Sequence, residues 1–214
     1  MSQHLKLYSN PLTANGIKMR LILKAINIKA EVINLQLHKG EQKSPEFLKI
    51  NPAGKIPVLI DDGNTLTESN AILYYLVNKY ESTLWPSDNH QQSQVLTWLF
   101  WQSSVWASAV SSFSHQRLVL PYWGFKGRDE INLKMLEDFH RAAKHLDDSL
   151  HSKSALVGEQ LSIADISLAS NLIFCEQARI PLTPYVHLKH WLNQLDDFSW
   201  WSETRLELDQ LLNH

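Results

Sequence analysis

Two kinds of hydrophobic pattern alternate at the beginning of the chain. Apolar and polar residues alternate over Leu5–Tyr8, which predicts a short strand. Apolar residues then recur at helical spacing over Ile17–Ile26, in a helix expected to begin near Asn15 or Gly16. Ala30–Leu35 is again typical of a strand. This strand–helix–strand order indicates that the two strands are parallel.

A second group of elements follows. Residues 38–46 are polar and predict a loop or a short helix. The short runs 56–60 and 65–67 are joined by Asp61–Asn64, a sequence typical of the turn in a β-hairpin. Apolar residues return at helical spacing over Ser69–Tyr80. The expected order of elements is therefore βαβαββα.

The pattern changes after this point and becomes entirely helical. Residues 82–92 show no hydrophobic period and contain Pro86, so we interpret them as a linker. Helical spacing recurs in three stretches, 95–113, 133–150 and 188–195. Between the last two, Ser162 and Asp165 have the spacing of a helix capping box. The prediction is an α/β domain at 1–81, a linker at 82–92 and an all-α domain at 93–214.

Composition adds a division of charge to this picture. The 214 residues are 44% apolar and 20% charged, which is typical of a globular protein, and the net charge of −2 argues against a strongly basic nucleic-acid binder. Residues 1–80 hold ten Lys or Arg and six Asp or Glu, whereas the rest holds ten and sixteen. All eight tryptophans lie from Trp85 onward. The first domain is therefore expected to be the basic one.

The single cysteine and the termini give further expectations. Cys175 lies in an apolar, apparently helical stretch, which predicts an inert buried thiol and excludes an internal disulfide. The N-terminus has no long apolar run, and no window reaches the roughly 18 apolar residues of a membrane-spanning helix. We therefore expect neither a secretory signal nor a membrane span, and a cytoplasmic protein.

Candidate chemistry is concentrated where the first strand leads into the first helix. No histidine pair has metal-binding spacing and no glycine-rich phosphate loop is present, so no metal is expected. Thr13 and Asn15 stand at the expected start of the helix, where free N–H groups and the helix dipole favour an anion such as a thiolate. The alternative is that these residues only cap the helix. Tyr8, at the end of the strand, is not favoured as a catalyst.

Five segments in order resemble the motifs of the cytosolic glutathione transferases. They are the loop Tyr8–Gly16, the segments Gly40–Leu48, Asn51–Leu59 and Thr67–Ile72, and the capping box Ser162–Asp165. The loop with Thr13 and Asn15 is most similar to the serine/threonine-type classes, and in particular to the bacterial nu class. The resemblance implies a thioredoxin-like first domain, a cis bond before Pro57, and glutathione as cosubstrate.

The resemblance also implies which residues hold glutathione. Glu68 would pair with the γ-glutamyl ammonium, and Ser69 would receive the γ-glutamyl carboxylate at a helix start. Ile56 would bond the cysteinyl backbone through its own main chain. Residues that would meet the glycine carboxylate are Gln42, Lys43 and Lys55. The alternative for each charged side chain is a solvated position on the surface.

Thiol activation is the mechanism that the resemblance implies. Thr13 or Asn15 would donate a hydrogen bond to the glutathione thiolate, and the sequence leaves open which of them dominates. The wall of a pocket for the second substrate is assigned to Leu12, Phe113 and Trp123, although aromatic residues on helices are more often core or interface. A homodimer is expected, with no nucleic-acid or membrane partner.

Three functions follow as hypotheses. The first is transfer of glutathione to a small electrophile. The second is glutathione-dependent reduction of disulfides or peroxides, as the likeness to the nu class implies, in which two glutathione molecules carry out the exchange. The third is a binding protein that keeps the fold without catalysis, because fold alone does not decide function.

Overall fold

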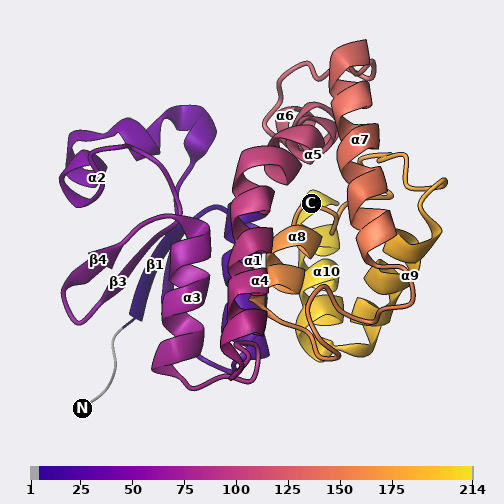
Figure 1. Cartoon of the computed structure of the whole chain (residues 1–214). Coiled ribbons are helices and arrows are strands. Elements are labelled where there is room, and N and C mark those ends of the chain that lie inside the picture. The colour runs from indigo at the N-terminus through magenta and orange to yellow at the C-terminus, as the bar shows by residue number, and fades with distance from the viewer. Residues whose placement is uncertain (1–4, 214) are drawn as a thin grey trace. The chain divides into compact units, whose positions relative to one another are not determined.

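The computed structural model describes residues 5–213, which divide into two compact units at Ser82 and Thr83 (Figure 1). The first unit has the predicted βαβαββα order. Its strands are β1 (Leu5–Ser9), β2 (Glu31–Asn34), β3 (Val58–Asp61) and β4 (Asn64–Leu66). Its helices are α1 (Ala14–Ala25), α2 (Pro45–Ile50) and α3 (Ser69–Lys79), with short 3₁₀ turns at Leu37–Lys39 and Glu41–Lys43.

The four strands form one sheet in the order β2-β1-β3-β4. β1 is parallel to β2 and antiparallel to β3, which is antiparallel to β4. The turn between β3 and β4 places Asp62 and Gly63 at φ angles of 47° and 83°, the two positive values that a tight type I′ hairpin requires. The predicted hairpin and the predicted cis bond between Ile56 and Pro57 are both confirmed.

The sheet is covered on both faces. Tyr8 of β1 packs edge-on against Phe47 of α2, with ring centroids 5.6 Å apart, in a cluster that includes Val58. Leu5 and Leu7 alternate with Tyr8 along the strand and are buried on the opposite face. The Tyr8 side chain is thus part of the packing beneath α2, in agreement with its exclusion as a catalyst.

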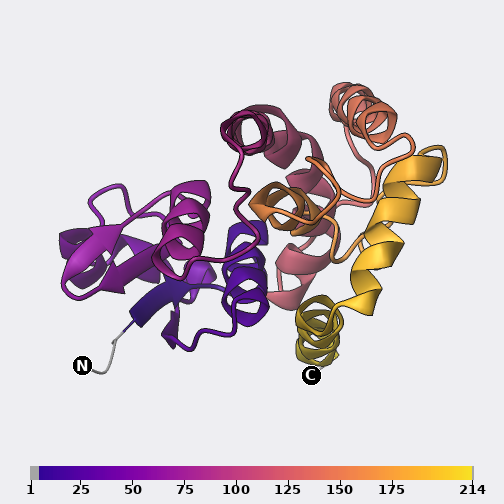
Figure 2. The same cartoon turned by 60° about the horizontal axis from the view of Figure 1, so that its bottom comes forward.

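The second unit is all-helical, as predicted. Its first helical run covers α4 (Asn89–Trp101), η3 (Gln102–Trp106), α5 (Ala107–Ser114), η4 (His115–Val119) and α6 (Leu120–Tyr122). The η3 and η4 segments are π-helical turns, so residues 89–122 form one continuous helix with two wider turns. The later helices are α7 (Leu133–Ser149), α8 (Ile163–Ala169), α9 (Val186–Gln194) and α10 (Ser199–Leu212), with a 3₁₀ turn at Leu195–Asp197. Figure 2 views α4 and α7 nearly end-on, so their axes run in similar directions.

Three details of this unit differ from the sequence expectation. The helix α4 begins at Asn89, inside the segment interpreted as a linker, because the Asp88 carboxylate accepts from the Gln91 amide at 2.9 Å and caps it. The C-terminal helix α10 was not predicted. Cys175 lies in a series of turns rather than a helix and is only partly buried, although burial still raises the pKa of its thiol.

The predicted capping box is confirmed and lies in the core of the helical unit. The buried Asp165 carboxylate accepts from the Ser162 amide at 2.8 Å and from the Leu156 amide at 3.0 Å. The Trp191 indole also donates to it, at 3.0 Å. Asp165 therefore ties α8 to α9 and to the preceding loop. Within residues 5–213, no helix has both the length and the apolar character needed to cross a membrane.

One buried charge stabilises the first unit where β3 meets α3. Asp61 is 1% exposed and accepts from the Tyr75 hydroxyl at 2.5 Å and from the Lys79 ammonium. Burial opposes ionisation of Asp61, but the hydrogen bonds from Lys79 and Tyr75 outweigh it and lower the pKa of the carboxyl. The ionised form is therefore the one that stabilises the fold.

We expect Asp61→Asn to lower the free energy of unfolding by about 1–3 kcal/mol at neutral pH, because it removes a buried charged acceptor from the Tyr75 and Lys79 donors. A lowered folded-state pKa stabilises the protein above the unfolded value of about 3.9 and ceases to do so as the pH falls through the folded value. The difference between the two proteins should therefore shrink in acid. Urea unfolding at several pH values measures it. The exposed neighbour provides the control, since Asp62→Asn should change little.

Candidate functional site

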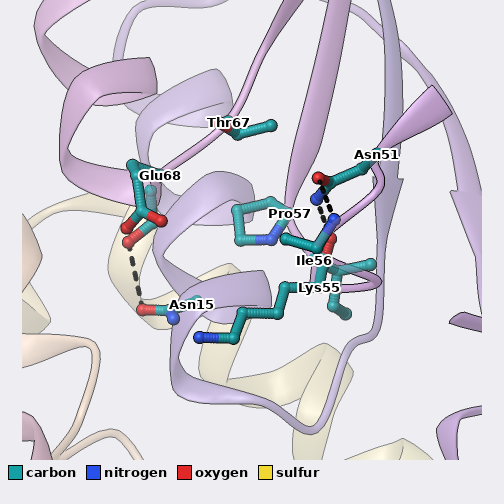
Figure 3. A pocket seen from close by; sticks show the side chains of 9 residues that line it. Asn15, Asn51, Lys55, Ile56, Pro57, Thr67 and Glu68 are labelled. Atoms are coloured by element: carbon teal, nitrogen blue, oxygen red, sulfur yellow. Dashed lines mark hydrogen bonds between the residues drawn. The ribbon is translucent and has the colours of Figure 1, made fainter. Parts of the chain in front are cut away.

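A pocket of about 160 Å³ opens on the first unit (Figure 3). Its walls come from the N-terminal turns of α1 and α3 and from the loop that precedes β3. It is lined by Asn15, Asn51, Ala53, Lys55, Ile56, Pro57, Thr67, Glu68 and Ser69. Two helix N-termini thus meet a loop that carries a cis bond, and both termini favour negative groups of a ligand.

The α1 wall depends on a close approach of two loops. A Cβ atom on Gly16 would lie 1.9 Å from the Asn10 carbonyl oxygen, so the chain needs glycine at this position. The Asn10 side chain in turn donates to the Leu35 carbonyl at 2.9 Å and accepts from the Leu12 amide at 3.0 Å. This packing holds the first turn of α1, and with it Asn15, at the pocket.

A chain of hydrogen bonds connects α1 with α3. The Ser69 hydroxyl donates to the Asn15 amide oxygen at 3.1 Å, and the fully buried Lys18 ammonium donates to Ser69 Oγ at 3.0 Å. Lys18 also donates to Asn70 Oδ1 at 2.7 Å. With its oxygen held by Ser69, the Asn15 amide directs its nitrogen into the pocket (Figure 3). Asn15 therefore presents a hydrogen-bond donor.

Two charged side chains line the pocket, and a third, Lys18, is hydrogen-bonded to the lining residue Ser69. Glu68 and Lys55 are exposed and supply one charge of each sign. Beneath them, burial lowers the pKa of Lys18 to about 7, while the nearby Glu68 carboxylate acts in the opposite direction. A zwitterionic ligand with additional carboxylates would find a partner for each of its charges here.

Glu68 has an unusual backbone conformation. It precedes α3 at a φ of 64° and a ψ of 111°, which costs a residue with a side chain about 1–3 kcal/mol. The conformation brings the carboxylate to the pocket wall beside the first turn of α3 (Figure 3). Strain of this kind is concentrated at functional sites.

The loop before β3 is held by the buried Asn51 side chain. Its amide nitrogen donates to the Lys55 carbonyl at 2.7 Å, and its amide oxygen accepts from the Ala53 amide at 3.1 Å. These two bonds shape the turn that leads to the cis bond between Ile56 and Pro57. Asn51 thereby positions the backbone of Lys55 and Ile56 at the pocket.

The structure brings half of the twelve predicted site residues together. Six of them line the pocket: Asn15, Lys55, Ile56, Pro57, Glu68 and Ser69. Thr13 does not line it. The Thr13 hydroxyl donates to the Asn10 carbonyl at 3.1 Å and accepts from the Gly16 amide at 3.1 Å, as an N-cap residue does. For Thr13 this arrangement matches the alternative that the residue only caps the helix, whereas Asn15 lines the pocket.

The segment with Gln42 and Lys43 lies outside the pocket lining. The Lys43 ammonium donates to the Ala53 carbonyl at 3.2 Å, which braces the turn behind the pocket. The Gln42 amide oxygen is buried and has no hydrogen-bond partner among residues 5–213. A role for either side chain toward a glycine carboxylate stays a prediction.

The residues assigned to the second substrate differ in exposure. Phe113 is 1% exposed and packs against Phe139, with ring centroids 5.1 Å apart. Leu12 is 3% exposed. Both side chains therefore expose little surface, and their assignment to a pocket wall stays a prediction. Trp123 is partly exposed, and its role stays a prediction.

Comparison with known proteins agrees with this geometry. Residues 3–78 match the model of the glutathione S-transferase N-terminal domain. Protein URE2 of Candida maltosa is 40% identical over 119 residues, which cover 52% of this chain and 36% of that relative. The chain therefore spans little more than a third of the length of that relative.

Solved structures extend the likeness to both units. A glutathione S-transferase of Pseudomonas fluorescens is 28% identical, with a TM-score of 0.81 over 92% of this chain and 96% of the other. The first unit therefore has the sequence of a glutathione S-transferase N-terminal domain, and both units together have the glutathione S-transferase fold. Ure2p in complex with glutathione, at 24% identity, shares the fold, with a TM-score of 0.78 over 95% of this chain and 93% of the other. The pocket described above lies on the first unit, which is the thioredoxin-like domain of this fold.

Sequence reasoning missed five residues of the site and its support, one of which is the lining residue Ala53. Asn51 and Thr67 stand inside the recognised motifs, but their contacts with the pocket depend on turns that spacing alone does not reveal. Lys18 and Asn70 meet across 52 residues of chain, and a lysine between apolar helix positions gave no signal of burial. Within the described residues, no cluster of three or more His, Cys, Asp or Glu could hold a metal.

The hydrogen bonds assign different roles to Thr13 and Asn15. We expect Thr13→Ala to lower the free energy of unfolding by about 1 kcal/mol through loss of the cap, with little change in the pKa of a bound thiol. Asn15→Ala should leave stability nearly unchanged and raise that thiol pKa by about one unit or more. Thermal unfolding and the ultraviolet absorbance of the glutathione thiolate measure the two effects. If Thr13→Ala raised the thiol pKa and Asn15→Ala did not, Thr13 would be the activating residue.

Proposed function

We propose that the protein is a glutathione transferase that activates the glutathione thiol for attack on a small electrophile. The observation that carries the proposal is the donor face of Asn15, oriented by Ser69 at the N-terminus of α1. A thiolate at this point would accept a hydrogen bond from the Asn15 amide nitrogen and lie in the field of the helix dipole. The match of residues 3–78 to the glutathione S-transferase N-terminal domain and the transferase fold of both units support the same proposal.

The charges of the pocket suit the rest of glutathione. The Glu68 carboxylate would pair with the γ-glutamyl ammonium, and the first turn of α3 would receive the γ-glutamyl carboxylate through its backbone N–H groups. Because the Ser69 hydroxyl donates to Asn15, Ser69 would meet that carboxylate through its backbone. Lys55 would reach the glycine carboxylate, and the main chain of Ile56 would pair with the cysteinyl backbone.

The energetic requirement is modest. A thiol with a pKa near 8.5 is only a few per cent ionised at neutral pH. Lowering that pKa by about two units needs roughly 2.7 kcal/mol of preference for the thiolate, which one charge-assisted hydrogen bond and a helix terminus can supply. The thiolate would then form a sulfur–carbon bond as the leaving group departs from the electrophile with its electron pair.

Two other functions use the same pocket. Glutathione-dependent reduction of disulfides or peroxides would break a sulfur–sulfur or oxygen–oxygen bond and leave oxidised glutathione. The other is a binding protein without catalysis, and the relative named Transcriptional regulator URE2 in Saccharomyces cerevisiae, 37% identical over 119 residues, is consistent with it. The resemblance also implies detoxification as the role and the cytoplasm as the location. Fractionation of cells would test the location.

Parallel assays with purified protein separate these functions. Protein and glutathione are incubated with a chlorodinitrobenzene-type electrophile, a mixed disulfide or a hydroperoxide. We expect conjugation with the electrophile. Reduction without conjugation would favour the second function. Glutathione binding without either reaction would favour the third, and absence of glutathione binding in calorimetry would contradict the first two.

Glu68→Gln tests the pairing with the ligand ammonium. We expect glutathione affinity to fall by about tenfold or more, because a charge-assisted hydrogen bond contributes about 1.5–3 kcal/mol. The unfolding temperature should change little, since Glu68 is exposed. Isothermal calorimetry measures the affinity. Glu46→Gln, at an exposed position on α2, is the matched control, and an equal loss in both variants would contradict the pairing.

We also propose a homodimer, which the family resemblance implies. Leu96, Phe100 and Val105 are exposed apolar residues four and five positions apart, and the longer step crosses the π-helical turn η3. Phe100 is 71% exposed, an unusual position for a large apolar side chain. A second copy would cover this row.

We expect Phe100→Asp to shift the protein from dimer to monomer in sedimentation experiments, because it would bury a charge in the proposed interface. Leu206→Asp, at an exposed leucine of α10, serves as the control. A wild-type protein that sediments as a monomer at all concentrations would contradict the dimer.

A further inference from the structure

We infer that Lys18 is a positioning residue of the glutathione site, which orients Ser69 and Asn15 and supplies a buried positive charge beneath the γ-glutamyl carboxylate. This inference rests on the proposed function, since it concerns how the same pocket holds its ligand. Lys18 does not line the pocket and would act through the residues that do.

The placement of Lys18 is unusual for a lysine. It lies on α1 between Ile17 and Met19, and all three side chains are buried. A lysine is almost never fully buried unless its ammonium is paired. Here Nζ donates to Ser69 Oγ at 3.0 Å and to Asn70 Oδ1 at 2.7 Å, both in the first turn of α3. The lysine thus spans the gap between two helix N-termini.

Direction in the hydrogen-bond chain follows from the chemistry of the ammonium. A protonated lysine has three donors and no acceptor, so Ser69 Oγ has to accept from it. The single hydroxyl proton of Ser69 is then directed to Asn15 Oδ1, 3.1 Å away. The Asn15 oxygen is occupied, and its nitrogen faces the pocket. A neutral amine could accept from Ser69 instead, and the orientation of Asn15 would no longer be imposed.

The buried charge also connects ligand binding to protonation. Burial lowers the pKa of Lys18 to about 7, so the free protein holds it partly neutral at neutral pH. The Glu68 carboxylate, which immediately precedes α3, favours the charged form of Lys18 and so acts to raise its pKa. Lys55, from the loop before β3, adds a positive charge to the same pocket. A ligand carboxylate bound at the first turn of α3 would stabilise the ammonium, so binding would take up a proton.

Calorimetry with S-methylglutathione tests this coupling, because the blocked thiol has no proton of its own to exchange. Titrations are made between about pH 6 and about pH 7.5 in buffers of different ionisation enthalpy, because an α-amino group such as that of the ligand loses its proton at about 7.7–8.0. We expect proton uptake by the wild-type protein to rise through this range toward one proton per ligand. Its affinity should fall as the pH rises above 7, by up to about tenfold for each pH unit.

Three variants complete the experiment. Lys18→Met should bind more weakly below pH 7 and show no proton uptake. Lys24→Met removes the same charge from the last turn of α1 and should behave as the wild type. Asn70→Leu removes an acceptor 2.7 Å from Nζ, so the fall in affinity should begin at a lower pH. Because Asn70→Leu retains Lys18, its pH profile tests the inference even if Lys18→Met fails to fold.

The outcomes separate the inference from the proposed function. A wild-type protein that binds S-methylglutathione with equal affinity and no proton uptake across this range contradicts the role of Lys18 alone. So does an Asn70→Leu profile that coincides with the wild type. A wild-type protein that does not bind the ligand at any pH contradicts the proposed function, and the inference with it.

Discussion

The proposed glutathione site depends on the hydrogen bond between the Ser69 hydroxyl and the Asn15 amide oxygen. This bond joins the first turns of two helices that begin 55 residues apart in the chain, α1 at Ala14 and α3 at Ser69. It also decides which end of the Asn15 amide faces the ligand. A bond between two neutral groups contributes only about 1 kcal/mol, so its geometry matters more than its strength. The surrounding packing supplies that geometry, through the close approach at Gly16 and the buried Lys18 below.

Several features of the fold were predictable because a short stretch of sequence determines each of them. The Asp–Gly pair before β4 requires two positive φ angles, and that requirement is visible in the sequence. The capping box at Ser162 is equally local. The start of α4 was missed because its signal is a single capping residue, Asp88, in a segment without hydrophobic period.

The site was predictable only in part, for a different reason. Asn15, Glu68 and Ser69 could be proposed because they stand in recognisable motifs. Which of Thr13 and Asn15 can donate to a ligand depends on the Asn10 carbonyl, because it accepts the hydrogen bond of the Thr13 hydroxyl. The role of Lys18 depends on partners 51 and 52 residues away. Spacing along the chain contains no information about such contacts, and only the folded arrangement supplies it.

The backbone at Glu68 limits how this pocket can change. Its positive φ favours glycine, and a glycine there would relieve strain and stabilise the fold, but it would remove the carboxylate from the pocket wall. Thermal stability and ligand recognition therefore make opposite demands on one residue. A search for stabilising substitutions that ignored the ligand would select against glutamate at this position, and the better-folded variants would be the poorer binders.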